Sequence, residues 1–317
     1  MTKQRFADKV FIITGAAGGI GYSIAEMAAR EGASIVFSDL KEGIGKQARD
    51  KLRKLNPAVD FLPIDMTIQE NAQDLVDFTV NKYGRVDVLI NNAGVLGVKG
   101  AIHNIEDISS FKKVLDCNVM TMVYCSHYVV NQMLKQTSES AIVNIASIAG
   151  MIGFPGNIAY GTSKHAVIGL TKCMALDYAT KGIRVNSVSP GVIQTPMLDA
   201  GIDRVNENRK ASGKEPVLPN HLLSPQNRVA APAEVANAVL FLASDKASHI
   251  TGVNLPVDGV LPHNKIGHKF PCDLNMNFCL YISIFILLKS IREPKIRALK
   301  FRIKKVFHTI ICAFNMH

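Results

Sequence analysis

Tyr160 and Lys164 are the two residues of this 317-residue chain whose types and spacing point most directly to chemistry. They stand four positions apart, so on a helix both side chains project from one face. A free tyrosine has a pKa of about 10, and accepting a proton at neutral pH requires lowering that pKa by up to about 3, equivalent to about 4 kcal/mol. A neighbouring ammonium group favours the phenolate. The pair predicts a tyrosine that exchanges protons with a substrate, although such a pair taken alone is common on helix surfaces.

A cluster of small residues follows the first apolar run of the chain. Gly15, Gly19 and Gly21 let the backbone turn sharply and approach a diphosphate, whose charge the free N–H groups of the next helix stabilise. Asp39 ends the second predicted strand, 18 residues after Gly21, where its carboxylate can accept hydrogen bonds from an adenosine ribose. A carboxylate there would repel a 2′-phosphate. NAD is therefore favoured over NADP as the cofactor. NADP remains an alternative, because Lys41 is close in sequence to Asp39.

The elements that must position these residues follow a regular rhythm from residue 9 to about 257. Short β-branched runs alternate with longer amphipathic stretches, which predicts repeated βαβ units. The expected strands are 10–13, 34–38, 60–64, 86–90, 141–145, 184–188 and 253–256. The expected helices are 19–31, 42–55, 68–82, 107–135, 158–180 and 233–244. This pattern predicts an α/β fold with a single Rossmann-type, doubly wound parallel sheet of about seven strands and helices on both faces.

Two segments depart from that rhythm. Residues 199–228 carry several glycines and prolines among charged residues, which predicts a substrate lid loop. Residues 265–317 hold 10 Lys and Arg against two acidic residues, so most of the net charge of +10 belongs to this tail. Its longest uncharged stretch has 15 residues, and a membrane-spanning helix needs about 20. We expect a catalytic domain at 1–264 and, at 265–317, an extension that is outside the fold or touches a membrane surface.

The composition also bounds the partners. Outside the tail the basic surplus is only 2, which argues against a nucleic-acid partner. The six cysteines form neither a CxxC pair nor a metal-ligand spacing, which favours reduced thiols in a cytoplasmic protein without a metal site. No secretory signal precedes the first predicted strand.

Several ordered motifs together resemble those of the classical short-chain dehydrogenase/reductase (SDR) family. The motifs are Thr14-Gly-Ala-Ala-Gly-Gly-Ile-Gly21, Asn91-Asn-Ala-Gly94, Asn118, Ser147, Tyr160-Gly-Thr-Ser-Lys164 and Pro190-Gly191. Each motif is weak alone, but the set is highly specific and covers the chain from about Asp8 to Gly259.

The resemblance implies four catalytic roles. Tyr160 would exchange a proton with the substrate oxygen, and Ser147 would hydrogen-bond that oxygen. Lys164 would bind the nicotinamide ribose and lower the pKa of Tyr160, while Asn118 would position a water that extends the proton path. The physical chemistry agrees, because hydride transfer to a carbonyl develops an alkoxide that needs a proton donor and a second hydrogen bond.

The resemblance also implies a set of cofactor contacts. Asp65 would contact the adenine ring, Asn91 to Gly94 would support the sheet and the adenosine side, and Pro190 to Thr195 would line the nicotinamide. The complete expected cofactor set is Gly15, Gly19, Ile20, Gly21, Asp39, Asp65, Asn91, Ala93, Gly94, Tyr160, Lys164, Pro190, Gly191, Ile193 and Thr195. Four apolar residues near the reactive centre in sequence are equally consistent with a substrate pocket or plain core: Met151, Phe154, Met197 and Leu198.

These observations favour an NAD-dependent oxidoreductase that acts on a small secondary alcohol or ketone. The main alternative is an NADPH-dependent carbonyl or 3-oxoacyl reductase, and a second is a non-catalytic dinucleotide-binding regulator. The intact set of Ser147, Tyr160 and Lys164 argues against the regulator, because binding alone needs no proton path. The resemblance further implies a homo-dimer or homo-tetramer.

Overall fold

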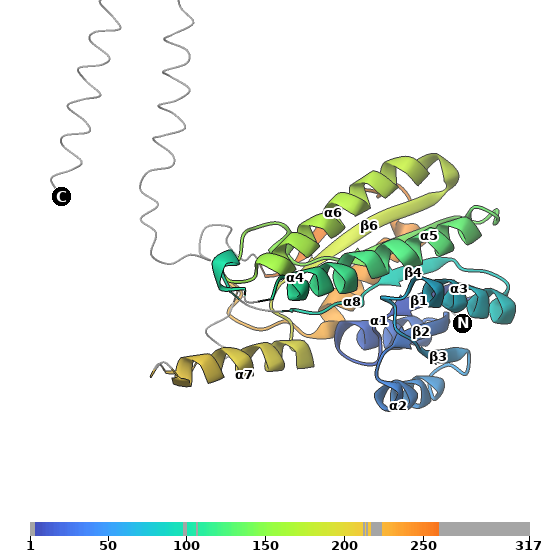
Figure 1. The fold of residues 1–317 in the computed structure, drawn as a ribbon. Coiled ribbons are helices and arrows are strands. Elements are labelled where there is room, and N and C mark those ends of the chain that lie inside the picture. Colours follow the sequence, from blue (N-terminus) through green and yellow to red (C-terminus); the bar gives the residue numbers. More distant parts are fainter. Residues whose placement is uncertain are drawn as a thin grey trace, which may run out of the picture. The chain divides into compact units, whose positions relative to one another are not determined.

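A computed structural model describes residues 4–97, 100–105, 107–211, 213, 215–216 and 224–259 (Figure 1). Within them, seven strands form one sheet in the order β3-β2-β1-β4-β5-β6-β7, and every neighbouring pair is parallel. The strands are β1 (Val10–Thr14), β2 (Ser34–Asp39), β3 (Val59–Pro63), β4 (Val88–Asn91), β5 (Ser140–Ile145), β6 (Ile183–Pro190) and β7 (Asn254–Val257). The predicted doubly wound parallel sheet is confirmed.

The helices alternate with the strands as the βαβ pattern predicts. They are α1 (Gly19–Arg30), α2 (Glu42–Arg53), α3 (Gln69–Tyr83), α4 (Ile108–Leu115), α5 (Thr121–Met133), α6 (Ile158–Tyr178), α7 (Pro196–Ala211) and α8 (Pro232–Ala243). A short π-helix, η2 (Asp116–Met120), joins α4 to α5, and a 3₁₀ turn, η3 (Ile148–Gly150), follows β5.

Two hydrophobic cores lie on opposite faces of the sheet. Odd-numbered residues of β1 such as Phe11 and Ile13 pack with α1, α2 and α8, whereas Ile12 between them packs with α3, α5 and α6. Successive side chains of a strand point to opposite faces, so a strand covered on both faces must be apolar throughout. Figure 1 shows these helices on either side of the sheet. The sheet is thereby buried except at its ends, and ligands bind such sheets at the carboxyl ends of the strands.

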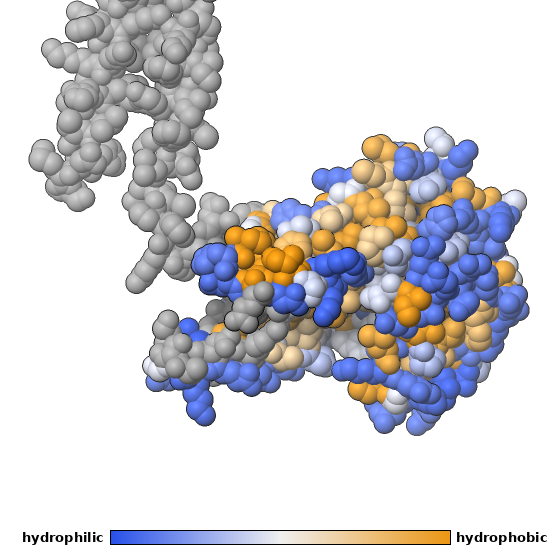
Figure 2. All heavy atoms as spheres, in the orientation of Figure 1, coloured by the Kyte–Doolittle hydropathy of each residue, from blue (hydrophilic) through white to orange (hydrophobic). Residues whose placement is uncertain are grey.

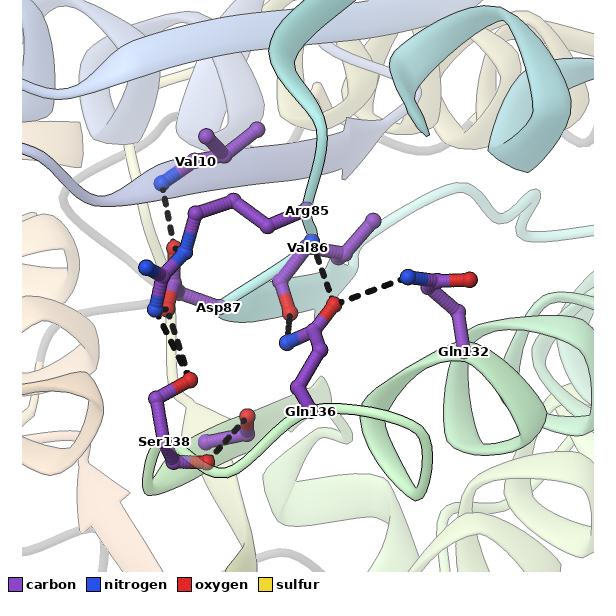
Figure 3. A network of polar contacts seen from close by, with 8 residues as sticks. Val10, Arg85, Val86, Asp87, Gln132, Gln136 and Ser138 are labelled. Carbon is purple, nitrogen blue, oxygen red and sulfur yellow. Dashed lines mark hydrogen bonds and ion pairs between the residues drawn. The ribbon is translucent and has the colours of Figure 1, made fainter. Parts of the chain in front are cut away.

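The amino ends of the central strands are held together by a polar network (Figure 3). Asp87, 1% exposed, accepts hydrogen bonds from the backbone N–H of Val10 at 3.0 Å and from Arg85 at 2.8 and 2.5 Å. Arg85 also donates to Ser138 at 2.8 Å. The side chain of Gln136 bonds both backbone groups of Val86, at 3.0 and 2.8 Å. These contacts tie β1, β4 and the segment before β5 together.

Two predicted segments differ in the structure. The single helix expected over 107–135 is interrupted, because residues 116–120 form the π-helix. The expected loop at 199–228 is helical over its first part, since α7 continues to Ala211. In both segments the backbone conformation therefore differs from what the local sequence pattern predicts.

Other sequence-based expectations meet the structure only in part. Within the described residues, Cys117, Cys125 and Cys173 are free thiols, and no helix there is long and apolar enough to cross a membrane. The extension at 265–317, with its three further cysteines, lies outside the described residues. Its separation from the catalytic domain stays a prediction.

Candidate active site

A cavity of about 420 Å³ lies at the carboxyl end of the sheet. It is bordered by the ends of β5 and β6, the start of α6, the segment after β4 and one face of α7. Three of the four predicted catalytic residues line it, together with six further residues of the predicted cofactor set: Ser147, Tyr160, Lys164, Ile20, Gly94, Pro190, Gly191, Ile193 and Thr195. The structure thus surrounds the reactive groups with residues from distant segments, from Ile20 to Val205.

Ser147 and Tyr160 meet in this cavity. Ser147 directly precedes η3, and its Oγ accepts a hydrogen bond from the backbone N–H of Ala149 at 3.1 Å, which fixes the side chain. Tyr160 lies in the first turn of α6 and lines the same cavity. Burial raises the pKa of Tyr160, and the nearby hydroxyl of Ser147 opposes that rise. The expectation that Lys164 and a bound, oxidised nicotinamide together lower this pKa stays a prediction. In the protein by itself the desolvation of the phenolate outweighs the favourable contact.

Lys164 lies one turn further along α6 and is 4% exposed. Its Nζ donates to the backbone carbonyl of Ile145 at 2.8 Å, and it stands 5.7 Å from the ring centre of Tyr160. Burial lowers the pKa of Lys164 to about 8, because a buried ammonium loses its hydration. Gly94 allows this close packing, since a Cβ there would lie 3.7 Å from Nζ and 3.0 Å from Oδ1 of Asn118.

Asn118 does not line the cavity, although it lies directly behind it. The side chain is fully buried in the π-helix. Its Oδ1 accepts from the backbone N–H of Val95 at 2.7 Å, and its Nδ2 donates to the Val95 carbonyl at 2.9 Å and to Ser163 at 3.0 Å. The side-chain amide is thus committed to protein partners. The water that Asn118 is expected to position stays a prediction.

The glycine loop between β1 and α1 requires its glycines for steric reasons. Gly15 has φ +65, and a Cβ on it would lie 2.8 Å from Cα of Ala93. Gly21 faces the side chain of Asn92, whose Nδ2 would be 2.5 Å from a Cβ at that position. Around Gly18, by contrast, a Cβ would meet nothing within 4 Å. The loop therefore packs tightly on the end of β4 and leaves open space at Gly18, as a diphosphate cradle requires.

Asn92 and Thr14 hold this loop in place. The resemblance gave Asn92 only a general supporting role within Asn91 to Gly94, and it gave Thr14 none. Nδ2 of Asn92 donates to the carbonyls of Thr14 at 3.0 Å and Gly15 at 2.7 Å. Oγ1 of Thr14 accepts from the backbone N–H groups of Asn92 and Ala93, both at 3.1 Å. The sequence does carry a sign of this role, because each of the two is a polar residue at the carboxyl end of a buried strand, β1 or β4.

Three predicted cofactor residues have protein partners of their own. Asp39 accepts from the backbone N–H groups of Ala17 at 3.1 Å and Lys41 at 3.2 Å, so its carboxylate is held at the edge of the glycine loop. Asp65 accepts from the backbone and side chain of Thr67, just before α3. The buried Asn91 donates to Ser126 and Asn144.

The hydrogen bonds of Asn91 support the sheet. The ribose contact of Asp39 stays a prediction. The proposed adenine contact of Asp65 stays a prediction, as do the contacts of Gly19 and Ala93. Gly19 has φ +58, and a Cβ on it would approach the side chain of Thr195 at 3.6 Å. The glycine loop and the segment after β6 therefore face each other.

The wall contributed by α7 is apolar. Met197, Leu198, Gly201, Ile202 and Val205 line the cavity at the i, i+4 spacing of one helix face. Phe154 lines it as well, whereas Met151 is absent from its lining. Figure 2 shows hydrophilic residues on the outer side of this helix. Three of the four residues left open between pocket and core thus belong to the pocket: Phe154, Met197 and Leu198.

Comparison with known proteins identifies the class. The family model described as enoyl-(acyl carrier protein) reductase matches residues 15–259. A 3β-hydroxysteroid dehydrogenase of Mediterraneibacter gnavus is 38% identical over 265 residues, covering 80% of this chain and 95% of the relative. A cyclopentanol dehydrogenase of a Comamonas strain is 39% identical over 257 residues, covering 80% and 97%.

A solved structure agrees. The NAD⁺-bound xylitol dehydrogenase has a TM-score of 0.75 and 34% identity, covering 80% of this chain and 99% of that one. The chain belongs to the classical short-chain dehydrogenase/reductase family, whose members are oxidoreductases that bind NAD(P). The resemblance found in the sequence is confirmed at the level of family and fold.

Proposed function

We propose that this protein is an NAD-dependent dehydrogenase that interconverts a secondary alcohol and the corresponding ketone. The observation that carries the proposal is that Ser147, Tyr160 and the buried Lys164 line one cavity at the carboxyl end of the sheet. The similarity to dehydrogenases of a hydroxysteroid and of cyclopentanol supports the alcohol as substrate. Bound NAD⁺ would supply the acceptor for the hydride that leaves the carbinol carbon.

The chain's own residues handle the proton of the alcohol. In oxidation, the phenolate of Tyr160 accepts the proton of the alcohol hydroxyl while the carbon gives up hydride, and the ketone forms. The hydroxyl of Ser147 donates a hydrogen bond to the same oxygen and keeps it within reach. In reduction the steps reverse, and Tyr160 returns the proton to the developing alkoxide.

Lys164 prepares Tyr160 for that exchange and positions the cofactor. Its ammonium, 5.7 Å from the phenol ring, favours the phenolate, and its remaining N–H groups suit the hydroxyls of a ribose. Because the protein without cofactor raises the pKa of Tyr160, the positive charge of an oxidised nicotinamide is the second contribution needed to form the phenolate. The proton path would continue from Lys164 to a water positioned by Asn118.

The experiment measures turnover of cyclopentanol with NAD⁺ and with NADP⁺, following nicotinamide absorbance. We expect turnover with NAD⁺, and a loss of at least about 1,000-fold for Tyr160→Phe, since a positioned proton acceptor contributes about 100- to 10,000-fold. Affinity for NADH should change less than about threefold in that variant. Equal losses of affinity and turnover would contradict the assigned role.

Cofactor choice is tested on the same assay. The carboxylate of Asp39 accepts hydrogen bonds from the backbone N–H groups of Ala17 and Lys41 beside the glycine loop. A 2′-phosphate bound there would be repelled by its negative charge. We expect Asp39→Ala to narrow the preference for NAD⁺ over NADP⁺ by about 100-fold, equivalent to about 3 kcal/mol of like-charge repulsion. A clear preference of the unmodified protein for NADP⁺ would favour the alternative, an NADPH-dependent carbonyl or 3-oxoacyl reductase.

A further inference from the structure

A line of buried polar side chains crosses the core behind the active site. Nδ2 of Asn91 donates to Oδ1 of Asn144 at 2.9 Å, and Nδ2 of Asn144 donates to Oγ1 of Thr171 at 2.9 Å. The three residues come from β4, β5 and α6 and are at most 1% exposed. Apolar side chains of similar volume would avoid the cost of burying polar groups. A buried polar contact can instead specify the register of two packed elements at a cost in stability.

Thr171 and Lys164 hold α6 to neighbouring residues of β5. The two side chains are seven positions apart, about two turns, so they share one face of the helix. Nζ of Lys164 donates to the carbonyl of Ile145, and Thr171 accepts from the adjacent Asn144. The hydroxyl of Thr171 donates to the carbonyl of Val167 at 2.8 Å, so its oxygen is left to act as the acceptor. These two contacts fix the rotation of α6 and its position along β5.

The position of α6 against β5 matters because the reactive groups are divided between these elements. Tyr160 lies on α6 one turn before Lys164, whereas Ser147 follows β5, three residues after Asn144. In the proposed reaction both hydroxyls act on one substrate oxygen. A displacement of about 1 Å between reacting groups can lower the rate about 100-fold. A small slide of α6 along β5 would therefore move Tyr160 away from Ser147 and slow the reaction.

We propose that the hydrogen bond between Asn144 and Thr171 positions the active site, because it sets the place of α6 relative to β5. It thereby sets the place of Tyr160 relative to Ser147. Neither Asn144 nor Thr171 belongs to the described lining of the cavity, so both act through other residues rather than on the substrate. They are positioning residues of the proposed reaction, and the inference rests on that reaction.

The test is Thr171→Val, which replaces the hydroxyl by a methyl group of similar size. We expect kcat for cyclopentanol with NAD⁺ to fall at least about 10-fold. Kd for NADH should change less than about threefold, since most of the expected cofactor residues lie on other elements. The pH at which kcat is half-maximal should rise, because Ser147 lowers the pKa of Tyr160 and would stand further away. Thr171→Ser keeps the hydroxyl and should restore kcat to within about threefold of wild type.

The matched control is Thr79→Val. Thr79 is also fully buried, and its hydroxyl donates to the carbonyl of Leu75, four residues earlier, at 2.7 Å. The same kind of bond joins Thr171 to Val167. Thr79 lies on α3, which contributes no residue to the described lining of the cavity. We expect kcat of Thr79→Val to stay within about twofold of wild type.

The double variant Asn144→Leu/Thr171→Val separates positioning from stability, and it keeps the test possible if Thr171→Val does not fold. It removes both polar partners, and Asn91 keeps Ser126 as an acceptor, so the free energy of unfolding should recover relative to Thr171→Val. We expect kcat to stay low, because apolar contacts alone do not specify the register.

Recovery of kcat together with stability in the double variant would overturn the inference, as would an unchanged kcat in Thr171→Val. A wild-type protein that oxidises no alcohol with either cofactor would instead overturn the proposed function, and the inference with it.

Discussion

At the scale of single residues, the site combines two ionisable groups that burial pushes away from their charged forms. Burial raises the pKa of Tyr160 and lowers that of Lys164 to about 8. Each group would hold its charge more easily in water, so the fold keeps both closer to neutrality than their reference values imply. The energy for forming the phenolate must then come from the bound cofactor and substrate as well as from Lys164.

Lys164 should leave a signature in the pH dependence of stability. Its pKa falls from 10.5 to about 8 on folding, so above pH 8 the unfolded chain binds a proton that the folded chain has released. Stability therefore rises with pH in that range. From pH 7 to pH 9, the free energy of unfolding of the wild-type protein should increase by about 1 kcal/mol relative to that of Lys164→Met.

Urea titrations of both proteins at the two pH values measure this difference. Comparing the change between pH values removes the constant penalty of leaving the carbonyl of Ile145 without its partner in the variant. Parallel pH profiles of the two proteins would show that the folded state holds Lys164 charged, against the burial argument.

At the scale of elements, the sequence predicted what depends on local pattern and missed what depends on contacts between distant segments. All seven strands follow from apolar runs, and their carboxyl ends correctly predicted where Ser147 and the glycine loop gather. The π-helix at Asn118 was not predictable from periodicity, because its amide is bound to Val95 and Ser163, which lie far away in sequence.

α7 shows a different kind of miss, since its signal was present in the sequence. Gly201, Gly213 and the later prolines suggested a loop, yet Met197, Leu198, Ile202 and Val205 recur at helical spacing.

The rise in the pKa of Tyr160 is a further feature that the sequence does not predict. It comes from the enclosure of the phenol by elements that meet only in the folded chain.

The network at the amino ends of the strands allows a prediction about stability apart from function. Asp87 is 1% exposed, and Arg85 provides its charged partner. Arg85→Ala would leave that buried carboxylate without a counter-ion, and we expect a loss of about 3 kcal/mol in the free energy of unfolding. Affinity for NADH should stay within about twofold, because the network lies at the opposite ends of the strands from the glycine loop.

The control for that substitution is Arg49→Ala. Arg49 pairs with Asp50, whose side chain is 62% exposed, so removing it should change the free energy of unfolding by less than about 1 kcal/mol. Denaturant unfolding of the three proteins gives the comparison. If both variants lost the same stability, the burial of Asp87 would not be what makes Arg85 important.

At the scale of the whole molecule, the described sheet, the family match and the site all lie before the basic extension. The sheet ends with β7 at Val257, the family match ends at residue 259, and the site residues lie between Gly15 and Val205. The predicted dimer or tetramer and the cytoplasmic location stay predictions, as does a membrane contact of the tail. The domain limits at 264 and 265 lead to a direct test.

A protein that ends at residue 264 should keep the activity of the full chain. Because every described residue of the two hydrophobic cores and of the cavity lies before residue 260, we expect kcat/KM for cyclopentanol within about twofold of the full-length value and a similar affinity for NADH. Sedimentation of both forms, with and without anionic vesicles, measures oligomeric state and lipid binding in the same samples. Loss of activity together with dissociation of an oligomer would show that residues 265–317 belong to the functional assembly, contrary to the domain limits proposed. Retained activity with lost vesicle binding would instead assign the tail's 10 basic residues to a membrane surface.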